Sequence, residues 1–502
     1  MIRKKGVCSM YQLTIAPQGR TLSAREGSNL MSVLRSAGIF MDAPCGGNGT
    51  CGKCTVLVDG QRVLACQTTI HADMTVSIPE AARLLILQEH NTPAANRTPD
   101  SEGYLLAFDI GTTSVVCFLL DGASGTELAK CSMLNPQAAF GADVISRIRA
   151  ALEGELEILR DEIRRGMTEL IQTVCSSSGT SPKDITCISV VGNPAMQQLF
   201  LGIPPDNLAG VPFAPVLTQA KRIPCEGFLP VCPGAELLIV PDISGYIGAD
   251  TLACVLSTEM CRQEEMTLLV DIGTNGEMVL GNQHRMLACS TAAGPALEGA
   301  NIRFGMRAAP GAIDHVWVEN GAIRCSVMGG GQAAGICGSG LIDAIAAALE
   351  LGLINKRGRI LSGEEREGQR ILCLTDTVYL TQEDIRQVQL AKGAVHAGIL
   401  LMARELDIPM ARIDRVLLAG AFGSFLNPAS ACRIGLLPEE LLPRIEAVGN
   451  AAGSGAKLLA CDKKMLPLAQ KLSEQIEFLE LATLPDFAKT FARSMNFREG
   501  NL

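Results

Sequence analysis

Two stretches far apart in the chain share one pattern of apolar and polar positions. Residues 104–109 (YLLAFD) are apolar up to a terminal aspartate, and residues 266–271 (MTLLVD) follow the same pattern. Each stretch is followed by a short turn of Gly, Thr, Ser or Asn and then by a second apolar run, at 115–120 and at 277–280. Apolar runs of this length between turn residues predict buried strands. We therefore expect two β-hairpins that form an internal repeat.

The first 80 residues have a different pattern. Residues 11–15 alternate as in a strand, residues 19–20 predict a turn, and a short second strand follows. Residues 28–38 predict a helix, with Ser28 as its N-cap and Gly38 as its stop. A loop rich in Cys and Gly comes next, and residues 55–60 then predict a strand and a tight turn. This order of elements resembles the β-grasp fold of small ferredoxins.

Four cysteines in this region are candidate metal ligands. Cys45, Cys51, Cys54 and Cys66 have the spacing C-x5-C-x2-C-x11-C, one residue more in the first gap than in plant-type ferredoxins. The longer gap is similar to that of adrenodoxin-like ferredoxins, and the short last gap to ferredoxin domains fused to larger enzymes. The glycines between the cysteines allow the loop to direct N–H groups at the sulfurs. We expect a [2Fe–2S] cluster. The alternative is zinc, although zinc knuckles usually pair two C-x2-C units.

Both predicted hairpin turns carry groups that bind phosphate. Asp109 and Asp271 end the first strands and are placed to hold Mg²⁺, directly or through water. Neither turn is a Walker loop, because no G-K-[ST] follows. A single turn of this kind would be weak support for a phosphate-binding site. Its duplication makes the prediction specific. The candidate phosphate contacts are Gly111, Thr112, Thr113, Gly273, Thr274, Asn275 and Gly276.

The repeated hairpins resemble the two phosphate loops of the acetate and sugar kinase, Hsc70 and actin (ASKHA) superfamily. Residues 242–251 are similar to its first connecting motif, 416–424 to its adenosine motif, and 449–455 to its second connecting motif. The resemblance implies that Asp250 is a general base or orients the attacking water. Glu277 is expected either to face the nucleotide or to be a solvated strand residue. The residues implied to cradle adenosine are Gly420, Gly423, Gly449, Asn450 and Gly453.

These patterns together predict an α/β protein with an α+β N-terminal domain. We expect a β-grasp [2Fe–2S] domain at 1–80, a linker at 81–103, and a two-lobed ASKHA ATPase with duplicated RNase H-like halves at 104–502. The lobes are expected at about 104–260 and 261–502. The linker is polar and contains proline, so it is expected to let the cluster domain move. A plain domain boundary explains it equally well.

Composition and charge narrow the class of function. The 502 residues are 47% hydrophobic and only 4% aromatic, with 51 glycines, which favours an α/β protein of several domains. A net charge of −9 argues against binding to nucleic acid or to an anionic membrane. No apolar run predicts a transmembrane helix, and the basic N-terminus lacks the apolar segment of a signal peptide. Nineteen cysteines without disulfide-type spacing predict reduced thiols in the cytoplasm of an oxygen-poor cell.

A ferredoxin module fused to such an ATPase resembles the reductive activators of corrinoid proteins. Residues 191–196, 292–299 and 336–343 also look like that family. The resemblance implies an ATP-hydrolysing iron–sulfur oxidoreductase that uses Mg-ATP and a [2Fe–2S] cluster to reduce the Co(II) corrinoid of a methyltransferase system to Co(I). It implies a corrinoid protein and a low-potential electron donor as partners, and a homodimer. Longer members have an extra middle domain, whereas fewer than 25 residues separate the two parts here.

Three other functions remain open on the sequence. The chain could donate electrons to another low-potential metalloenzyme, as the activators of 2-hydroxyacyl-CoA dehydratases do, although these hold a [4Fe–4S] cluster between subunits. It could be a redox-gated ATP-binding regulator without enzyme activity. It could also be a small-molecule kinase, which has no evident need for a ferredoxin domain.

Other conspicuous residues are expected to be structural. Cys289 and Cys337 lie in apolar surroundings and are expected to be core residues. Residues 329–331 (GGG) predict a loop turn, and Trp317 in an alternating strand is expected to pack. The five histidines have no metal-binding spacing.

Overall fold

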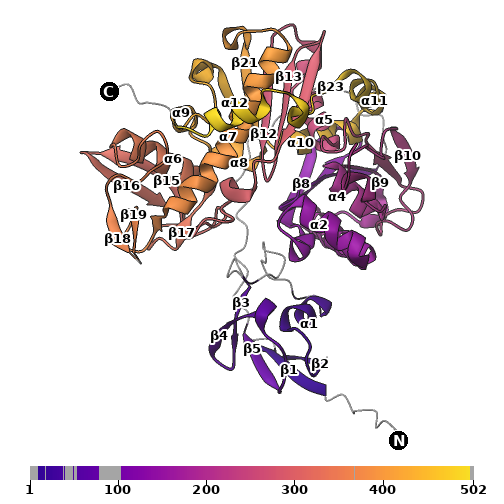
Figure 1. Ribbon diagram of the computed structural model, residues 1–502. Helices are drawn as coiled ribbons and strands as arrows, with labels where there is room; N and C mark the ends of the chain where they lie inside the picture. Colours follow the sequence, from indigo (N-terminus) through magenta and orange to yellow (C-terminus); the bar gives the residue numbers. More distant parts are fainter. Residues whose placement is uncertain are drawn as a thin grey trace, which may run out of the picture.

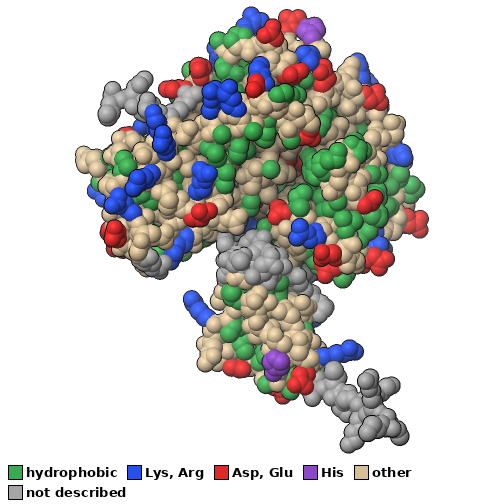
Figure 2. Space-filling view, viewed as in Figure 1, with side chains coloured by type: hydrophobic (Ala, Val, Ile, Leu, Met, Phe, Trp, Pro, Cys, Tyr) green, Lys and Arg blue, Asp and Glu red, His purple; other side chains and the backbone are tan. Residues whose placement is uncertain are grey.

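The computed structural model describes residues 10–16, 19–37, 39, 49, 54–77, 103–366 and 368–497. In this part of the chain, one small mixed sheet and two larger sheets form the frame of the molecule (Figure 1). Cys45, Cys51 and residues 81–102 of the expected linker lie outside the described residues. Charged side chains of both signs are scattered over the visible face (Figure 2). No helix of the described part combines the length and apolar character needed to cross a bilayer.

The N-terminal sheet has the strand order β2-β1-β5-β3-β4. Strand β1 is antiparallel to β2 and parallel to β5, and the helix α1 (Leu30–Ser36) follows β2. Leu13, Leu34 and Val56 form part of its small core and are fully buried. The predicted β-grasp arrangement is confirmed. Its strands are β1 (Met10–Ala16), β2 (Arg20–Arg25), β3 (Thr55–Val58), β4 (Gln61–Leu64) and β5 (Met74–Ser77).

The cap of α1 differs from the prediction by one residue. The side chain of Asn29, rather than that of Ser28, accepts a hydrogen bond from the backbone N–H of Ser32 at 3.2 Å. The Asn29 amide also donates to the carbonyl oxygen of Cys66 at 2.8 Å. Asn29 therefore ties the start of the helix to the segment that carries one of the candidate cluster ligands.

The first large sheet has the order β10-β11-β9-β6-β7-β8. Strands β6, β7 and β8 form an antiparallel meander, and β9 pairs with β6 in parallel. The strands β6 and β7 are the first predicted hairpin, which is confirmed. The bounds are β6 (Tyr104–Ile110), β7 (Ser114–Asp121), β8 (Glu127–Leu134), β9 (Ile185–Gly192), β10 (Lys221–Pro224) and β11 (Glu236–Ile239).

The second large sheet has the order β22-β21-β12-β13-β14-β23, in which β22-β21-β12-β13-β14 repeats the topology of β11-β9-β6-β7-β8 and β23 is added at the other edge. Strands β12, β13 and β14 are antiparallel neighbours, and β21 pairs with β12 in parallel, as β9 does with β6. The predicted duplication of RNase H-like halves is confirmed. The bounds are β12 (Thr267–Ile272), β13 (Gly276–Gly281), β14 (Met286–Thr291), β21 (Arg415–Ala419), β22 (Ile445–Gly449) and β23 (Glu477–Phe478).

Two helices lie between the large sheets. The helices α5 (Ala249–Ser257) and α10 (Ala451–Cys461) pack on each other, and α10 also lies against β6 and β9. One apolar core joins them to both sheets, through residues such as Leu105 of β6 and Val279 of β13. A Cβ atom at Gly455 would lie 2.1 Å from the carbonyl oxygen of Ala253, so these helices are in close contact.

The outer faces of the two sheets are covered by further helices. The first sheet is covered by α2 (Val144–Ala150), α3 (Leu156–Ser178) and α4 (Pro194–Leu201). The second is covered mainly by α6 (Gly338–Glu350), α7 (Gln382–Glu405) and α9 (Pro428–Arg433). The remaining helices are α8 (Gly420–Phe425), α11 (Met465–Gln475) and α12 (Phe487–Ser494).

Two small sheets extend the second half of the molecule (Figure 1). In the first, Trp317 on β15 is 44% exposed, so the expectation that it packs was wrong. Cys289 and Cys337 are buried as expected. The strands are β15 (Ala312–Glu319), β16 (Ala322–Val327), β17 (Gly335–Ile336), β18 (Glu364–Arg366), β19 (Gln369–Cys373) and β20 (Tyr379–Leu380).

Candidate functional site

The two predicted phosphate loops are tight hairpin turns. The N–H of Gly111 donates to the carbonyl oxygen of Ser114 at 2.9 Å, and the N–H of Gly273 donates to that of Asn275 at 2.9 Å. A Cβ atom at position 111 would lie 2.9 Å from the Ser114 carbonyl oxygen, which explains the glycine. The loops thus have equivalent positions in the two halves, as the sequence repeat predicts.

One carboxylate joins the two loops. The hydroxyl of Thr113 donates to Oε2 of Glu298 at 2.6 Å, and the hydroxyl of Thr274 donates to the same oxygen at 3.3 Å. Glu298 ends a short 3₁₀ helix (Pro295–Glu298) that follows β14. The loops of the two halves therefore lie within reach of a single side chain. The sequence placed Glu298 in a family-like stretch but gave it no role.

Four acidic side chains gather beside these loops, and we call Asp109, Asp250, Asp271 and Glu277 the carboxylate cluster. Asp271 and Glu277 are direct cross-strand partners on β12 and β13, so their side chains share one face of the sheet. Burial, followed by the charges of Asp250 and Asp271, raises the pKa of Glu277 well above its usual range. Of the two expectations for Glu277, the one that directs it toward the site is therefore supported.

The other half of the molecule supplies Asp109 and its partner. Asp109 lies near the end of β6 and accepts a hydrogen bond from the side-chain amide of Asn450 at 2.9 Å. Burial raises the pKa of Asp109 to about 6, although the bond from Asn450 opposes the rise. Asp250 lies in the first turn of α5, where burial and the charge of Asp109 raise its pKa to about 7 against a bond from the Thr251 N–H.

The chemistry of this donor set fits Mg²⁺ bound to a nucleotide. Like charges directly opposite on neighbouring strands repel each other, and a hard divalent cation with carboxylate ligands would relieve the repulsion. Within the described residues, no three His, Cys, Asp or Glu side chains form a preset metal site. This agrees with the usual behaviour of Mg²⁺, which takes few ligands from protein and completes its shell with phosphate oxygens and water.

The raised carboxyl pKa values predict a pH-dependent stability. A carboxyl group whose pKa is higher in the folded than in the unfolded protein stabilises the fold at low pH and loses that contribution as the pH rises through the folded pKa. The pKa values of about 6 for Asp109 and about 7 for Asp250 place this loss between roughly pH 4 and 7. We expect the free energy of unfolding, measured by urea titration without Mg²⁺, to fall by a few kcal/mol from pH 4.5 to 8.

The variant Asp250→Asn isolates this effect. At pH 8 it should be more stable than the wild type by about 1–3 kcal/mol, because the amide is neutral, and at pH 4.5 the difference should shrink. Asp376→Asn, in the exposed turn between β19 and β20, is a control that should not change the pH profile. Equal stability of wild type and Asp250→Asn at both pH values would contradict the prediction.

Three further side chains hold the first phosphate loop in place. Arg147 is fully buried and donates from Nη2 to the carbonyl oxygen of Thr112 at 2.5 Å. Asn193 donates to the Thr112 hydroxyl at 3.1 Å and caps α4. Asn135 donates to the carbonyl oxygen of Gly111 at 2.8 Å. The sequence gave no role to any of them, although an Asn-Pro helix start at residue 193 is a recognisable capping signal.

The glycines expected to cradle adenosine are explained mostly by protein packing. A Cβ atom at Gly453 would lie 2.7 Å from the ring of Phe118, and one at Gly423 would lie 3.2 Å from the backbone of Leu418. At Gly449, with φ of +66°, a Cβ atom would meet nothing within 4 Å. Of these three positions, Gly449 is therefore the one that leaves open space for a ligand.

Gly420 acts on the carboxylate cluster itself. Its φ is +80°, and a Cβ atom would lie 2.5 Å from Oδ1 of Asp271. We expect Gly420→Ala to displace the Asp271 carboxylate and to lower the rate of ATP hydrolysis by about tenfold or more, since a small misplacement can cost 100-fold. Gly352→Ala is the matched control, because its φ is +66° and a Cβ there has open space. Equal hydrolysis rates and unfolding midpoints in both variants would contradict the prediction.

The cluster region is described in part. Cys54 and Cys66 are buried, with 1% and 8% exposure, in the core of the N-terminal domain. The amide of Gln67 donates to the Cys66 sulfur at 3.6 Å. Gly49 has a φ of +77°, and a Cβ there would collide with the Gln67 side chain at 2.9 Å. A buried thiol pair, an amide directed at a sulfur and a loop that requires glycine fit an iron–sulfur cluster.

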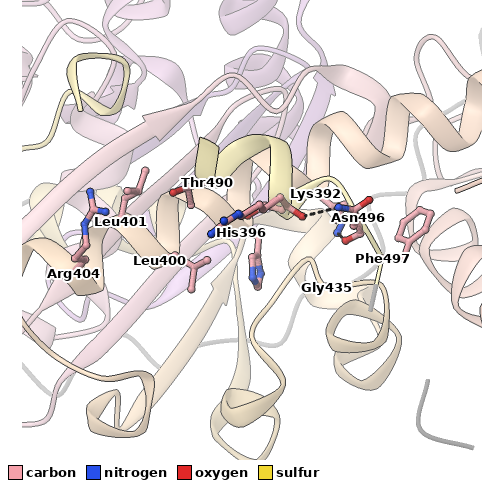
Figure 3. Close-up of a pocket in the computed structure, with 11 residues that line it drawn as sticks. Lys392, His396, Leu400, Leu401, Arg404, Gly435, Thr490, Asn496 and Phe497 are labelled. Atoms are coloured by element: carbon pink, nitrogen blue, oxygen red, sulfur yellow. Dashed lines mark hydrogen bonds between the residues drawn. The ribbon is translucent and has the colours of Figure 1, made fainter. Parts of the chain in front are cut away.

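A cavity of about 430 Å³ lies elsewhere on the second half of the molecule. Figure 3 shows Lys392 of α7 bonded to Asn496 in the segment after α12, with His396 on the same helix. The Lys392 ammonium donates to the carbonyl oxygen of Asn496 and lies 5.3 Å from the centre of the Phe497 ring. None of its lining residues belongs to the phosphate loops or to the carboxylate cluster, so the cavity is separate from the candidate nucleotide site.

Comparison with known proteins decides the family. The chain is 33% identical over 580 aligned positions to the corrinoid activation enzyme RamQ of Eubacterium limosum, and the alignment covers 95% of this chain and 97% of RamQ. The chain belongs to the family of corrinoid reductive activators. A second family member, the [Co(II) methylated amine-specific corrinoid protein] reductase of Methanosarcina barkeri, is 27% identical over 433 positions, which cover 78% of this chain and 77% of that protein.

A solved structure of this activator family has the same fold. The reductive activator for corrinoid,iron-sulfur protein matches with a TM-score of 0.72 and 30% identity, over 97% of this chain and 98% of that one. Three family models match successive parts of the activator chain: a 2Fe-2S iron-sulfur cluster binding domain at 13–73, the RACo middle region at 104–263, and the C-terminal domain of RACo, the ASKHA domain, at 265–502. The match at 104–263 covers the first large sheet.

Proposed function

We propose that this activator uses ATP to transfer one electron from a [2Fe–2S] cluster to the Co(II) corrinoid of a methyltransferase-system protein, which restores Co(I). The similarity to RamQ over nearly the whole of both chains carries the proposal. It is supported by the match to a cluster-binding domain and by two phosphate loops that meet at one carboxylate. The cluster would be held by Cys45, Cys51, Cys54 and Cys66, and when bound it supplies a single electron at low potential.

The nucleotide roles follow from the site geometry. Asp109 and Asp271 would hold Mg²⁺ from opposite halves, and the hydroxyls and N–H groups of the two loops would bind phosphate oxygens. Asp250, with a pKa of about 7, is suited to accept a proton from the attacking water near neutral pH. Gly449 and Asn450 would border the adenosine.

The reason for the use of ATP is energetic. Reduction of Co(II) is uphill from a centre whose potential is about −400 mV in plant-type ferredoxins. Closure of the two ATPase halves on Mg-ATP would let the closed form bind the corrinoid protein differently from the open form. A tenfold difference in these affinities corresponds to about 1.4 kcal/mol of driving force.

Several finer features belong to the same proposal. We propose that residues 1–80, 81–103 and 104–502 act as cluster domain, linker and ATPase, with lobes near 104–260 and 261–502. We also propose Mg²⁺ as the metal bound with ATP, a homodimer as the assembled form, the cytoplasm as the location, and a separate low-potential protein as the electron donor.

The deciding experiment is anaerobic. The reduced, cluster-loaded protein is mixed with a Co(II) corrinoid protein, and the visible spectrum is followed with Mg-ATP, with Mg-ADP and without nucleotide. We expect Co(I) to appear only with Mg-ATP. Normal cluster reduction and ATP turnover without any Co(I) would overturn the corrinoid assignment and favour another low-potential acceptor, as in the dehydratase activators.

A further inference from the structure

The position of Glu298 is fixed by packing on both sides. Leu297 is 1% exposed, and a Cβ atom at Gly338 would lie 1.9 Å from the Leu297 carbonyl oxygen, so the short 3₁₀ helix lies directly on the start of α6. After it, Gly299 has a φ of +80°, and a Cβ there would collide with the backbone of Met306. The backbone that presents Glu298 therefore has little freedom, whereas its side chain is half-buried and reaches both loops.

The two bonds to Glu298 use the same protons that a phosphate would use. A threonine hydroxyl has one hydrogen to donate, so Thr113 cannot donate to Glu298 and to a phosphate oxygen at once. The same holds for Thr274. Both acceptors are anionic, so the two kinds of hydrogen bond are similar in strength. Binding of a phosphate group between the loops must therefore compete with Glu298.

A buried positive charge lies near the Glu298 carboxylate. Arg147, buried behind the first loop, lies within electrostatic range of Glu298, and Arg307 lies near Arg147. The carboxylate therefore has positive charge available when it loses the two hydroxyls. A carboxylate that keeps positive charge nearby when its bonds to the threonine hydroxyls break is suited to breaking and re-forming those bonds repeatedly.

On the basis of the proposed nucleotide function, we propose that Glu298 is a positioning residue that links the two ATPase halves through Thr113 and Thr274 and yields these hydroxyls to the terminal phosphate of ATP. The link then reforms after hydrolysis. Glu298 would oppose the binding of ATP more than the binding of ADP.

The test uses the full-length, cluster-loaded protein and measures KM and kcat for ATP hydrolysis together with Kd for ATP and ADP. Glu298→Ala should lower KM and Kd for ATP by about tenfold, since one or two charged hydrogen bonds no longer compete, and should change Kd for ADP much less. Its kcat should change much less, because ATP has already taken the two hydroxyls from Glu298 in the complex that reacts. Glu298→Gln keeps an acceptor oxygen without the charge, so its affinity for ATP should lie between those of the wild type and Glu298→Ala.

A double-mutant cycle shows whether Glu298 acts through the two threonines. Thr113→Val and Thr274→Val keep the shape of the side chain and remove the hydroxyl. In the Thr113→Val, Thr274→Val background, Glu298→Ala should have little further effect on kcat or on the preference for ATP. The controls are Glu319→Ala and Thr126→Val, both on exposed surfaces away from the loops, which should leave all constants unchanged.

Each outcome decides the proposal. If the wild type hydrolyses ATP but Glu298→Ala changes the affinities for ATP and ADP equally, this inference alone is overturned. The same holds if the effects of Glu298→Ala and of the threonine variants are additive. A wild type that neither binds nor hydrolyses ATP would overturn the proposed function and this inference with it. If Glu298→Ala does not fold, Glu298→Gln and the threonine variants supply the same comparison.

Discussion

Replacement of Asp271 by asparagine is expected to abolish ATP-dependent formation of Co(I). Asp271 faces Glu277 across the β12–β13 hairpin and has Gly420 against its Oδ1 atom, so it has little room to move. The amide has nearly the same shape but cannot offer a charged oxygen to Mg²⁺. We expect the rates of ATP hydrolysis and of Co(II) reduction to fall by on the order of 100-fold or more.

The spectrum of the cluster gives the internal control for this variant. Cys54 and Cys66 lie in the core of the separate N-terminal domain, so Asp271→Asn should keep the full visible absorption of the iron–sulfur centre. Asp121→Asn is the matched substitution, because Asp121 ends β7 at the far end of the first hairpin from its phosphate loop. Retention of ATP-dependent Co(I) formation by Asp271→Asn would show that the second loop does not bind the nucleotide metal.

Cys54→Ser is expected to lose the cluster and keep ATP binding, the reverse of Asp271→Asn. Cys54 is 1% exposed and belongs to the core of the N-terminal domain, and ferredoxin-type [2Fe–2S] clusters are held by four thiolates. We expect loss of the visible cluster absorption and of all Co(II) reduction, with ATP binding retained because no nucleotide-binding residue is changed. Iron and sulfide analysis of the wild type also tests the zinc alternative.

The control for this variant is Cys232→Ser. Cys232 is partly exposed in a loop of the first half and donates to the carbonyl oxygen of Pro233 at 3.3 Å, a bond that serine can replace. It should retain the cluster and the full rate of Co(I) formation. A Cys54→Ser protein with an unchanged spectrum would remove Cys54 from the ligand set.

Local patterns were sufficient for much of the fold. The hairpins at β6–β7 and β12–β13 were predicted because an apolar run, a turn and a second apolar run are adjacent in the sequence. Because this pattern occurs twice in the sequence, it also predicted that the two halves share one topology. The family resemblance then placed Asp109, Asp250 and Asp271 in one site, and their electrostatic coupling in the structure supports that grouping.

Contacts between distant parts of the chain were not predictable in this way. Glu298 is 185 residues from Thr113, and Asn450 is 341 residues from Asp109, so no local pattern indicates either pair. The exposure of Trp317 likewise depends on which neighbours cover β15. The glycines of the expected adenosine site illustrate another limit, because a sequence does not distinguish space for a ligand from close packing of the protein.

The contact of α5 with α10 has a mechanical consequence. Gly455 and Ala253 are small residues that bring the two backbones close together where the helices cross. Such a surface offers a low barrier to lateral sliding, the shear type of domain motion. Asp250 lies at the start of one helix and Asn450, which holds Asp109, directly precedes the other. A slip along this crossing would change the distance between Asp250 and Asp109. The two helices would therefore couple ATP hydrolysis to the conformation of the whole ATPase.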